Sequence, residues 1–337
     1  MPRVKEFGLS LEMSSAAEMV RCARLAEAAG FGSFWLPEDP FFRGAFSVLT
    51  AVACHTEALR IGTSIINPYT RHPALIAMEF GAFDEISHGR GILGIGAGVR
   101  FWIREQLHLG WNRPAQAIRE SVAIIRALLR GERVTYSGEI FSLTDAALHF
   151  SPPRPAPPIH LGVTGPKNLQ MAGEIADGVI LGTLSSPEYV RFAREQVRLG
   201  AQRAGRSLEG FELSALLPIS VSDNETEARE AVKPIIAVLL GIGAFEASSP
   251  VLRCIDFPES LLQQFRERFQ QGDIPVDLVD DESIDHFTVA GSPAHCRKRL
   301  AEYVDAGLTI PIAFEVPGVP PEQTIARVRQ HLLPEFL

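Results

Sequence analysis

The 337-residue sequence has few cysteines, and the four that it has are spread along the chain. Cys22, Cys54, Cys254 and Cys296 form no C-x-x-C pair, which argues against a disulfide framework and against a zinc site. No other spacing typical of metal ligands stands out, so we expect no metal. Dispersed cysteines of this kind are typical of a reducing compartment, and we expect a cytoplasmic protein.

Long hydrophobic runs and an excess of positive charge are also missing. No apolar run approaches the roughly 18 residues that a membrane-spanning helix needs. Arg3, Lys5 and Glu6 interrupt the first residues, unlike the apolar stretch of a signal peptide. The net charge is −8, whereas nucleic-acid-binding domains are normally basic. We therefore expect neither a membrane nor a nucleic acid as partner.

What the sequence does have is a regular alternation of strand-like and helix-like segments. Apolar strands are expected at 5–11, 33–39, 59–67, 89–98, 159–164, 177–182, 211–222 and 309–316. Helices are expected at 16–30, 46–58, 73–89, 113–131, 166–176, 187–204, 224–240, 292–307 and 321–333. Strands without clean two-residue alternation are buried on both faces, as in parallel sheets. Eight such units predict a single (β/α)8 barrel domain over residues 1–337, with a doubly wound open sheet as the alternative.

Three segments depart from the alternation. Residues 133–143 predict a hairpin with Ser137-Gly138 at its turn. The proline-rich stretch 149–158 leads straight into another apolar strand, so we interpret it as a connection within one fold. Residues 241–287, before the last βα unit, predict a helical insertion that caps the barrel mouth. Its sequence FPESLLQQFRERFQQ favours an amphipathic helix pair, part of which would also suit a partner subunit.

Polar and aromatic side chains gather directly after the third strand, in IGTSIINPYTRHP (61–73). In a barrel the loops after the strands meet at the carboxyl-terminal face, where the chemistry takes place. Asn67, Tyr69, Arg71 and His72 are therefore candidate site residues. The alternative is that Asn67-Pro68 only makes a turn while Arg71 and His72 are solvated.

The same face carries acidic residues after the first two strands. Glu12 follows the first strand and is our candidate proton donor or acceptor, although it could instead only favour a helix dipole. Glu38 and Asp39 follow the second strand. We predict Glu12, Asp39 and His72 as the catalytic residues. After the fourth strand, GIGAG (94–98) fails the dinucleotide fingerprint because position 99 is valine, so Gly96 and Gly98 are expected to let a flat ligand approach the backbone.

The fifth strand ends in a turn suited to phosphate. Thr164, Gly165 and Lys167 surround the start of a helix that opens on a proline. Free backbone N–H groups at a helix start favour an anion, and a lysine would add to this. A plain helix cap is the alternative interpretation.

Three sequence blocks resemble one enzyme family. SIINPYTRHP (64–73), FDEISHGRGILGIGAG (83–98) and DDESIDHFTVAGSP (280–293) with YVDAGLT (303–309) are similar to the luciferase-like flavin and deazaflavin oxidoreductases. The similarity is closest to the branch that uses coenzyme F420, typified by methylenetetrahydromethanopterin reductase. It covers nearly the whole chain in the same order and implies a (β/α)8 barrel.

The resemblance also implies roles for individual residues. It implies a non-prolyl cis peptide between Ser64 and Ile65 that backs the cofactor ring, with Asn67 lining the ring pocket. It places Asp39 beside the cofactor as the acidic residue. The remaining positions carried over to the cofactor are Gly162, Thr164 and Gly165 in a phosphate turn, and Gly182 and Thr183 at the next strand end.

The implied activity is hydride transfer between C5 of the deazaflavin and a small organic substrate. Members that oxidise alcohols often have a histidine directly after the acidic residue, and this sequence has Pro40 there. Pro40 favours an imine-like or alkene carbon as the reacting centre. An FMN-dependent monooxygenase and a barrel that binds a flavin or deazaflavin without turnover are the alternatives. Family members are often homodimers, and we expect one here.

The substrate pocket has the weakest signal. Arg71 and His72 could steer the substrate or the polyanionic cofactor tail, and Tyr69 lies beside them. Trp102, with Phe101 and Trp111, suggests an aromatic wall, although aromatic residues in a long loop often serve packing alone.

Overall fold

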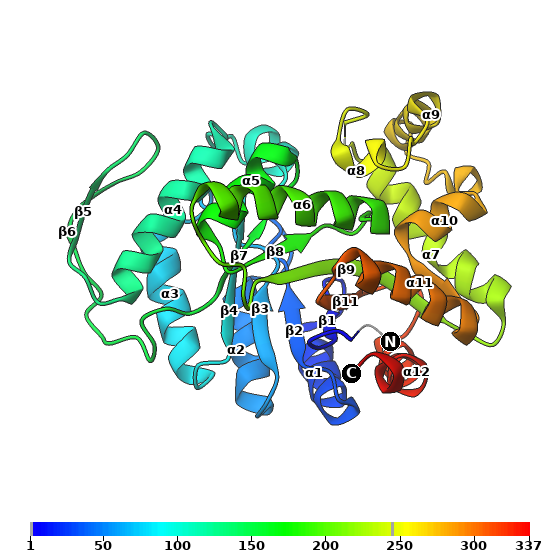
Figure 1. The fold of residues 1–337 in the computed structure, drawn as a ribbon, viewed down its shortest axis with the longest axis horizontal. Coiled ribbons are helices and arrows are strands. Elements are labelled where there is room, and N and C mark those ends of the chain that lie inside the picture. The colour runs from blue at the N-terminus through cyan, green and yellow to red at the C-terminus, as the bar shows by residue number, and fades with distance from the viewer. Residues whose placement is uncertain (1–2, 244–245) are drawn as a thin grey trace.

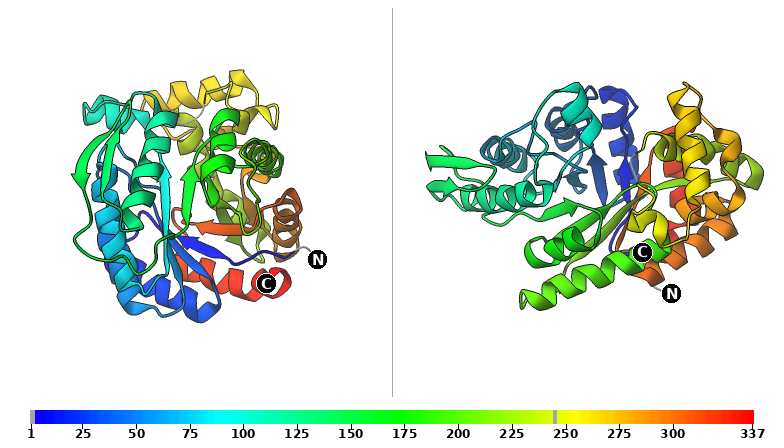
Figure 2. Two further views of the ribbon diagram at one scale, coloured as in Figure 1. Left: turned by 60° about the vertical axis from the view of Figure 1, so that its left-hand side comes forward. Right: turned by 90° about the horizontal axis from the view of Figure 1, so that it is seen from above.

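A computed structural model describes residues 3–243 and 246–337 as a closed parallel barrel with helices around it (Figures 1 and 2). The barrel strands are Gly8–Ser10 (β1), Ser33–Leu36 (β2), Arg60–Thr63 (β3), Gly91–Gly96 (β4), Ile159–Gly162 (β7), Gly178–Leu181 (β8), Glu212–Val221 (β9) and Ile310–Phe314 (β11). They pair in this order, and β11 closes the ring against β1. The predicted (β/α)8 barrel is confirmed, and the open sheet is excluded.

Helices follow the strands as the alternation predicted. Their bounds are Ala16–Ala29 (α1), Ala45–His55 (α2), Pro73–Ile86 (α3), Pro114–Leu129 (α4), Pro166–Ile175 (α5), Pro187–Arg203 (α6), Glu225–Gly241 (α7), Pro293–Ala306 (α11), Pro321–His331 (α12) and Leu333–Phe336 (α13). The first and last parts of the described chain lie side by side, since the Val4 N–H donates to the Phe336 carbonyl. No helix within 3–243 and 246–337 combines the length and apolar character needed to cross a membrane.

Some elements have other bounds than the sequence predicted, and others were not predicted. The predicted hairpin exists as β5 (Val134–Ser137) and β6 (Ser142–Ala146), but its second strand runs beyond 143. Figure 1 shows it at the edge of the molecule, beside α4. The short strand β10 (Val289–Gly291) extends the sheet on β9, and a π-helical turn η1 (Phe101–Gln106) fills the loop after β4. Both are too short to produce a periodic signal.

The insertion is helical, as expected, but FPESLLQQFRERFQQ forms one helix rather than a pair. Its elements are α8 (Pro250–Arg253), α9 (Glu259–Gln270), the 3₁₀ turn η2 (Val276–Leu278) and α10 (Asp281–Phe287). Positions 244 and 245 of this segment lie outside the described residues. Leu262 and Phe265 of α9 are buried, and Phe269 lies against Gly241 of α7, where a Cβ would come within 2.7 Å of it. Figure 1 shows α8 and α9 beside the end of α7.

A single tryptophan fills much of the barrel interior. Trp35 is fully buried, and its indole N–H donates to Ser33 Oγ at 2.8 Å. A Cβ at Gly62 would lie 2.4 Å from the Trp35 ring, and one at Gly8 would lie 2.9 Å from it. These two glycines on the flanking strands therefore make room for the indole. The other inward-facing apolar residues packed with it are Ile92, Ile180, Leu216, Ile310, Ile312 and Phe314.

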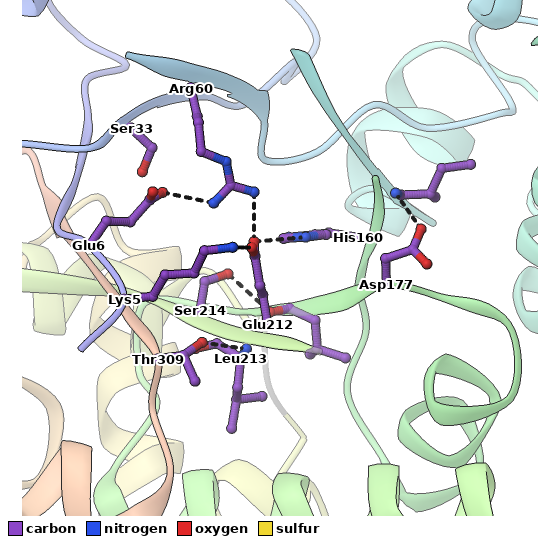
Figure 3. Close-up of polar contacts among 12 residues, drawn as sticks. Lys5, Glu6, Ser33, Arg60, His160, Asp177, Glu212, Leu213, Ser214 and Thr309 are labelled. Carbon is purple, nitrogen blue, oxygen red and sulfur yellow. Dashed lines mark hydrogen bonds and ion pairs between the residues drawn. The ribbon is translucent and has the colours of Figure 1, made fainter. Parts of the chain in front are cut away.

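A network of paired charges occupies the amino-terminal end of the barrel (Figure 3). Arg60 contacts Glu6 at 3.1 Å and Glu212 at 2.9 Å. Glu212 also pairs with Lys5 and lies 3.2 Å from His160 Nε2. Burial alone would raise the pKa of Glu212, but the nearby His160 ring and the Arg60 guanidinium hold it well below its usual range. This end of the barrel is therefore closed by ion pairs that favour stability.

Removing Glu212 should destabilise the whole barrel. Glu212→Ala leaves Arg60 and Lys5 without this carboxylate, and breaking a buried ion pair costs about 3 to 5 kcal/mol. Urea unfolding of the purified protein measures the loss. Glu195→Ala is the matched control, because it breaks an exposed pair with Arg198 on α6 and should change stability far less. Equal losses in both variants would contradict the role given to the network.

Candidate active site

Two carboxyl groups meet at the carboxyl-terminal end of the barrel. Gly8 faces Trp35 in the barrel interior, and Ser10 and Glu12 follow at two-residue steps on the same side. Asp39 stands three residues after the end of β2, the strand paired with β1. The Glu12 and Asp39 side chains are hydrogen-bonded to each other. The structure thus brings together two of the predicted catalytic residues.

The environment of this pair favours the protonated form of Glu12. Burial, then the charge and hydrogen bond of Asp39, and then the charge of Glu315 raise the pKa of Glu12 to about 8. Burial also raises the pKa of Asp39, while the hydrogen bond from Glu12 acts in the opposite direction. The pair therefore shares a proton that Glu12 holds near neutral pH. A carboxyl group tuned in this way is suited to general acid–base chemistry.

Asn67 organises the polar turn after β3. The buried Asn67 Oδ1 accepts hydrogen bonds from the N–H of Tyr69 at 3.1 Å and from the N–H and hydroxyl of Thr70 at 2.9 and 3.0 Å. Tyr69 donates its hydroxyl to the Asn112 carbonyl at 2.7 Å, and its ring lies 6.3 Å from that of Trp111. Burial raises the pKa of Tyr69 to about 12. These contacts fix the loop after β3 against the loop after β4.

Arg71 and His72 also make structural contacts rather than lying free in solvent. Arg71 pairs with Glu38 at 3.2 Å and with Glu79, which joins the loop after β2 to α3. His72 caps α3, since its Nδ1 accepts from the Ala74 N–H at 3.1 Å. Within the described part of the chain, no contact joins His72 to Glu12 or Asp39. The structure therefore does not bring His72 together with the other two predicted catalytic residues.

The Ser64–Ile65 peptide bond is cis, as the resemblance implied. The Ile65 side chain lies against two glycines of the neighbouring strands. A Cβ at Gly96 would come within 2.8 Å of Ile65, and one at Gly162 within 2.6 Å. Gly96 and Gly162 thus make room for Ile65, whereas the sequence suggested that Gly96 exposes backbone to a flat ligand. Gly98 has a positive φ of 68° and packs on Ile103 and Asn67.

Open space remains at the ends of β7 and β8. Gly165 precedes α5 with a φ of +79°, no side chain caps this helix, and a Cβ at Gly165 would meet nothing within 4 Å. Thr164 and Lys167 are exposed beside it. A Cβ at Gly182 would also meet nothing within 4 Å, and Thr183 is half-buried next to it. An uncapped helix start with a nearby lysine fits a phosphate group.

Two serine hydroxyls in the upper barrel lack a hydrogen-bond partner among the described residues. They are Ser10 Oγ and Ser64 Oγ, both buried. Ser64 precedes Ile65, and Ser10 precedes Glu12 by two positions. Unpartnered buried hydroxyls are uncommon and often mark places where a bound group completes the hydrogen bonding. Together with the two open glycines, they leave polar groups and space that a bound ligand could use at this end of the barrel.

Aromatic side chains line the rim of this region. Phe41, which follows Asp39 by two residues, is 71% exposed. The Phe42 ring lies 6.4 Å from that of Trp102, which brings the loop after β2 to the loop after β4. Phe101 and Met13 are also exposed. The sequence pointed to Trp102 but not to the Phe41-Phe42 pair, which the run PEDPFF could have suggested.

Comparison with known proteins identifies the family. Residues 4–309 match the family model of the luciferase-like monooxygenases, and the chain belongs to this family. The 5,10-methylenetetrahydromethanopterin reductase of Archaeoglobus fulgidus is 34% identical over 95% of this chain and 96% of its own. The F420-dependent glucose-6-phosphate dehydrogenase of Microbacterium testaceum is 28% identical over 97% of this chain and 95% of its own.

Solved structures agree with the fold. The coenzyme F420-dependent tetrahydromethanopterin reductase of Methanopyrus kandleri superimposes with a TM-score of 0.91 at 30% identity, over 99% of this chain and 100% of that one. The FMN complex of a type II Baeyer–Villiger monooxygenase from Pseudomonas putida superimposes over 99% of each chain, with a TM-score of 0.72 at 18% identity. At that identity the likeness shows the fold alone.

Glu12→Gln should raise the stability of the protein in a pH-dependent way. An unfolded glutamate has a pKa of about 4.5, whereas Glu12 in the fold has one of about 8. Between these values the folded protein keeps a proton that the unfolded chain releases, so wild-type stability falls as the pH rises. Glutamine carries no such penalty, and the gain in Tm should grow from pH 5 to pH 8.

Thermal unfolding at several pH values measures this difference. Glu209→Gln, at an exposed position, is the control and should show no such growth with pH. A Tm difference for Glu12→Gln that stays constant with pH would contradict the raised pKa of Glu12.

Proposed function

We propose that the protein is a coenzyme F420-dependent oxidoreductase that transfers hydride between the deazaflavin C5 and a small organic substrate. The observation that carries this is the meeting of Glu12 and Asp39 at the carboxyl-terminal end of a luciferase-like barrel, where burial and the charge of Asp39 raise the pKa of Glu12. Relatives of nearly full-length similarity support it, since they are F420-dependent reductases and dehydrogenases by name. The non-catalytic alternative is disfavoured because a raised carboxyl pKa has a cost in stability that binding alone does not require.

The residues at the barrel mouth would hold the cofactor in two places. Gly165, Thr164 and Lys167 at the start of α5 would bind a phosphate group, and Gly182 and Thr183 leave space beside them. Ile65, for which Gly96 and Gly162 make room, would support the ring. The hydroxyl of Ser64 and the turn built on Asn67 and Gly98 line the same region. F420 supplies reversible hydride exchange at C5 when it is bound.

The carboxyl pair handles the proton. Glu12 donates a proton to the substrate, or removes one from it, and Asp39 accepts the hydrogen bond that orients Glu12. Arg71 acts indirectly, because it holds Glu38 and so positions the loop that contains Asp39. His72 acts through the start of α3, and its contacts support a positioning role rather than a catalytic one.

The substrate is a flat organic molecule with an imine-like or alkene carbon. Pro40 follows Asp39 at the position where the family resemblance implies a histidine in members that oxidise alcohols. Phe41, Phe42 and Trp102 offer an aromatic rim for a flat ring, and Tyr69 lies on the neighbouring loop. The reductases named for methylenetetrahydromethanopterin point to the same kind of carbon.

The assembly is a homodimer in the cytoplasm. Within the predicted insertion 241–287, helices α8, α9 and α10 cap the barrel mouth. Helix α3 exposes Leu75, Met78 and Ile86, an apolar set that a second subunit would cover. Dispersed free cysteines support a reducing compartment. Sedimentation of the native protein tests the dimer, and a monomer at micromolar concentration would contradict it.

Cofactor choice is tested by titrating the purified protein with F420 and with FMN, following tryptophan fluorescence. We expect F420 to bind more tightly.

Gly182→Leu should weaken F420 binding about tenfold or more while leaving the Tm unchanged, because the leucine side chain would enter open space. Tighter binding of FMN would move the protein to the flavin-dependent monooxygenases.

Glu12→Gln should lower turnover by about 10²-fold or more while F420 binds as in the wild type, because loss of a general acid slows proton transfer without touching cofactor contacts. Stopped-flow reduction or oxidation of bound F420 with a substrate panel measures this. Glu209→Gln should behave as the wild type. Full turnover in Glu12→Gln would remove the proposed role of Glu12.

A further inference from the structure

Glu315 binds the loop that carries Glu12. Its Oε2 accepts hydrogen bonds from the N–H groups of Glu12 at 2.7 Å and Met13 at 2.8 Å. Its Oε1 accepts from the Ser14 hydroxyl at 2.7 Å. Both carboxyl oxygens of Glu315 are therefore used to hold three consecutive residues after β1.

The barrel itself fixes Glu315 in this position. It follows β11 directly, and its own N–H donates to the Ser10 carbonyl at 3.0 Å. Ser10 and Phe314 are paired in the register of β1 and β11. Glu315 thus continues the pairing of the two strands by one residue before its side chain reaches the loop.

We propose that Glu315 is a positioning residue for the reaction: it fixes residues 12–14 and places a negative charge beside the Glu12–Asp39 pair. This rests on the proposed function, in which Glu12 transfers the proton. The three hydrogen bonds set where the Glu12 backbone lies, and hence where its side chain meets Asp39. The negative charge of Glu315 disfavours the ionised form of Glu12.

The charged groups that act on Glu12 are Asp39, in the loop after β2, and Glu315, in the loop after β11. After burial and Asp39, the charge of Glu315 raises the pKa of Glu12 further. A residue that only held the loop in place would need hydrogen-bond acceptors but no charge at this position. The negative charge of Glu315 therefore distinguishes a role in the reaction from a purely structural role.

The decisive variant is Glu315→Gln, which keeps the size and one acceptor oxygen but removes the charge. The protonation of Glu12 is followed by the infrared band of its carboxylic acid, assigned as the band that Glu12→Gln abolishes. In Glu315→Gln the midpoint of its pH titration should fall, because the nearby negative charge that favours the protonated form is removed. Ser14→Ala removes one hydrogen bond without changing charge and should leave the midpoint unchanged. Equal midpoints in wild type and Glu315→Gln would overturn the proposal.

Activity provides the second measurement. The alkaline limb of kcat/KM should shift in Glu315→Gln by the same amount as the infrared midpoint, with F420 affinity unchanged. Glu315→Asp keeps the charge on a shorter side chain, so it should retain the midpoint but lower kcat. If Glu315→Gln does not fold, Glu315→Asp decides, and a wild-type kcat in that variant overturns the proposal. If the wild type neither binds nor uses F420, the proposed function fails, while the infrared midpoint still tests Glu315.

Discussion

Closure of the barrel between β1 and β11 is the constraint on which the candidate site depends. The register of these two strands places Glu315 beside residues 12–14, which are 301 to 303 positions away in the sequence. Pairing of β1 with β2 then brings Asp39 to Glu12. Each carboxyl group comes from a different loop, and none would lie near another in an open chain. The site is thus a direct product of the way the ring closes.

The charged residues at the two ends of the barrel have opposite kinds of neighbour. At the amino-terminal end, Arg60 lies between Glu6 and Glu212, so opposite charges offset the cost of burial. At the other end, the half-buried Glu12 and Asp39 lie together with Glu315 nearby, and burial and like charge raise the pKa of Glu12. Paired charges at one end and a carboxyl group of raised pKa at the carboxyl-terminal end are the arrangement expected where the chemistry lies at that end of a barrel.

The sequence predicted the barrel and two carboxyl groups of the site because both depend on local pattern. Doubly buried strands show as apolar runs, and Glu12 and Asp39 stand just after such runs. Glu315 also follows a strand, but its importance lies in a contact across the whole chain, which no local pattern reveals. Strand β10 and the π-helical turn η1 were missed because their form depends on the neighbours they pack against. The hydrogen bonds accepted by His72 and Asn67 could not be predicted either, because they depend on the folded conformation of the loop.

The glycines of the barrel mouth show why residue type alone does not locate a ligand. Gly96 and Gly162 look like bare backbone in the sequence, yet the Ile65 side chain fills the space above both. Gly165 and Gly182 look no different, yet the space beside them is open. The open glycines follow β7 and β8, whereas the carboxyl pair follows β1 and β2, with β3 and β4 between them. Because the ring is closed, β3 and β4 lie between the two sets on one side and β9 and β11 on the other, and Ser64 and Ile65 lie directly after β3 on the first of these sides.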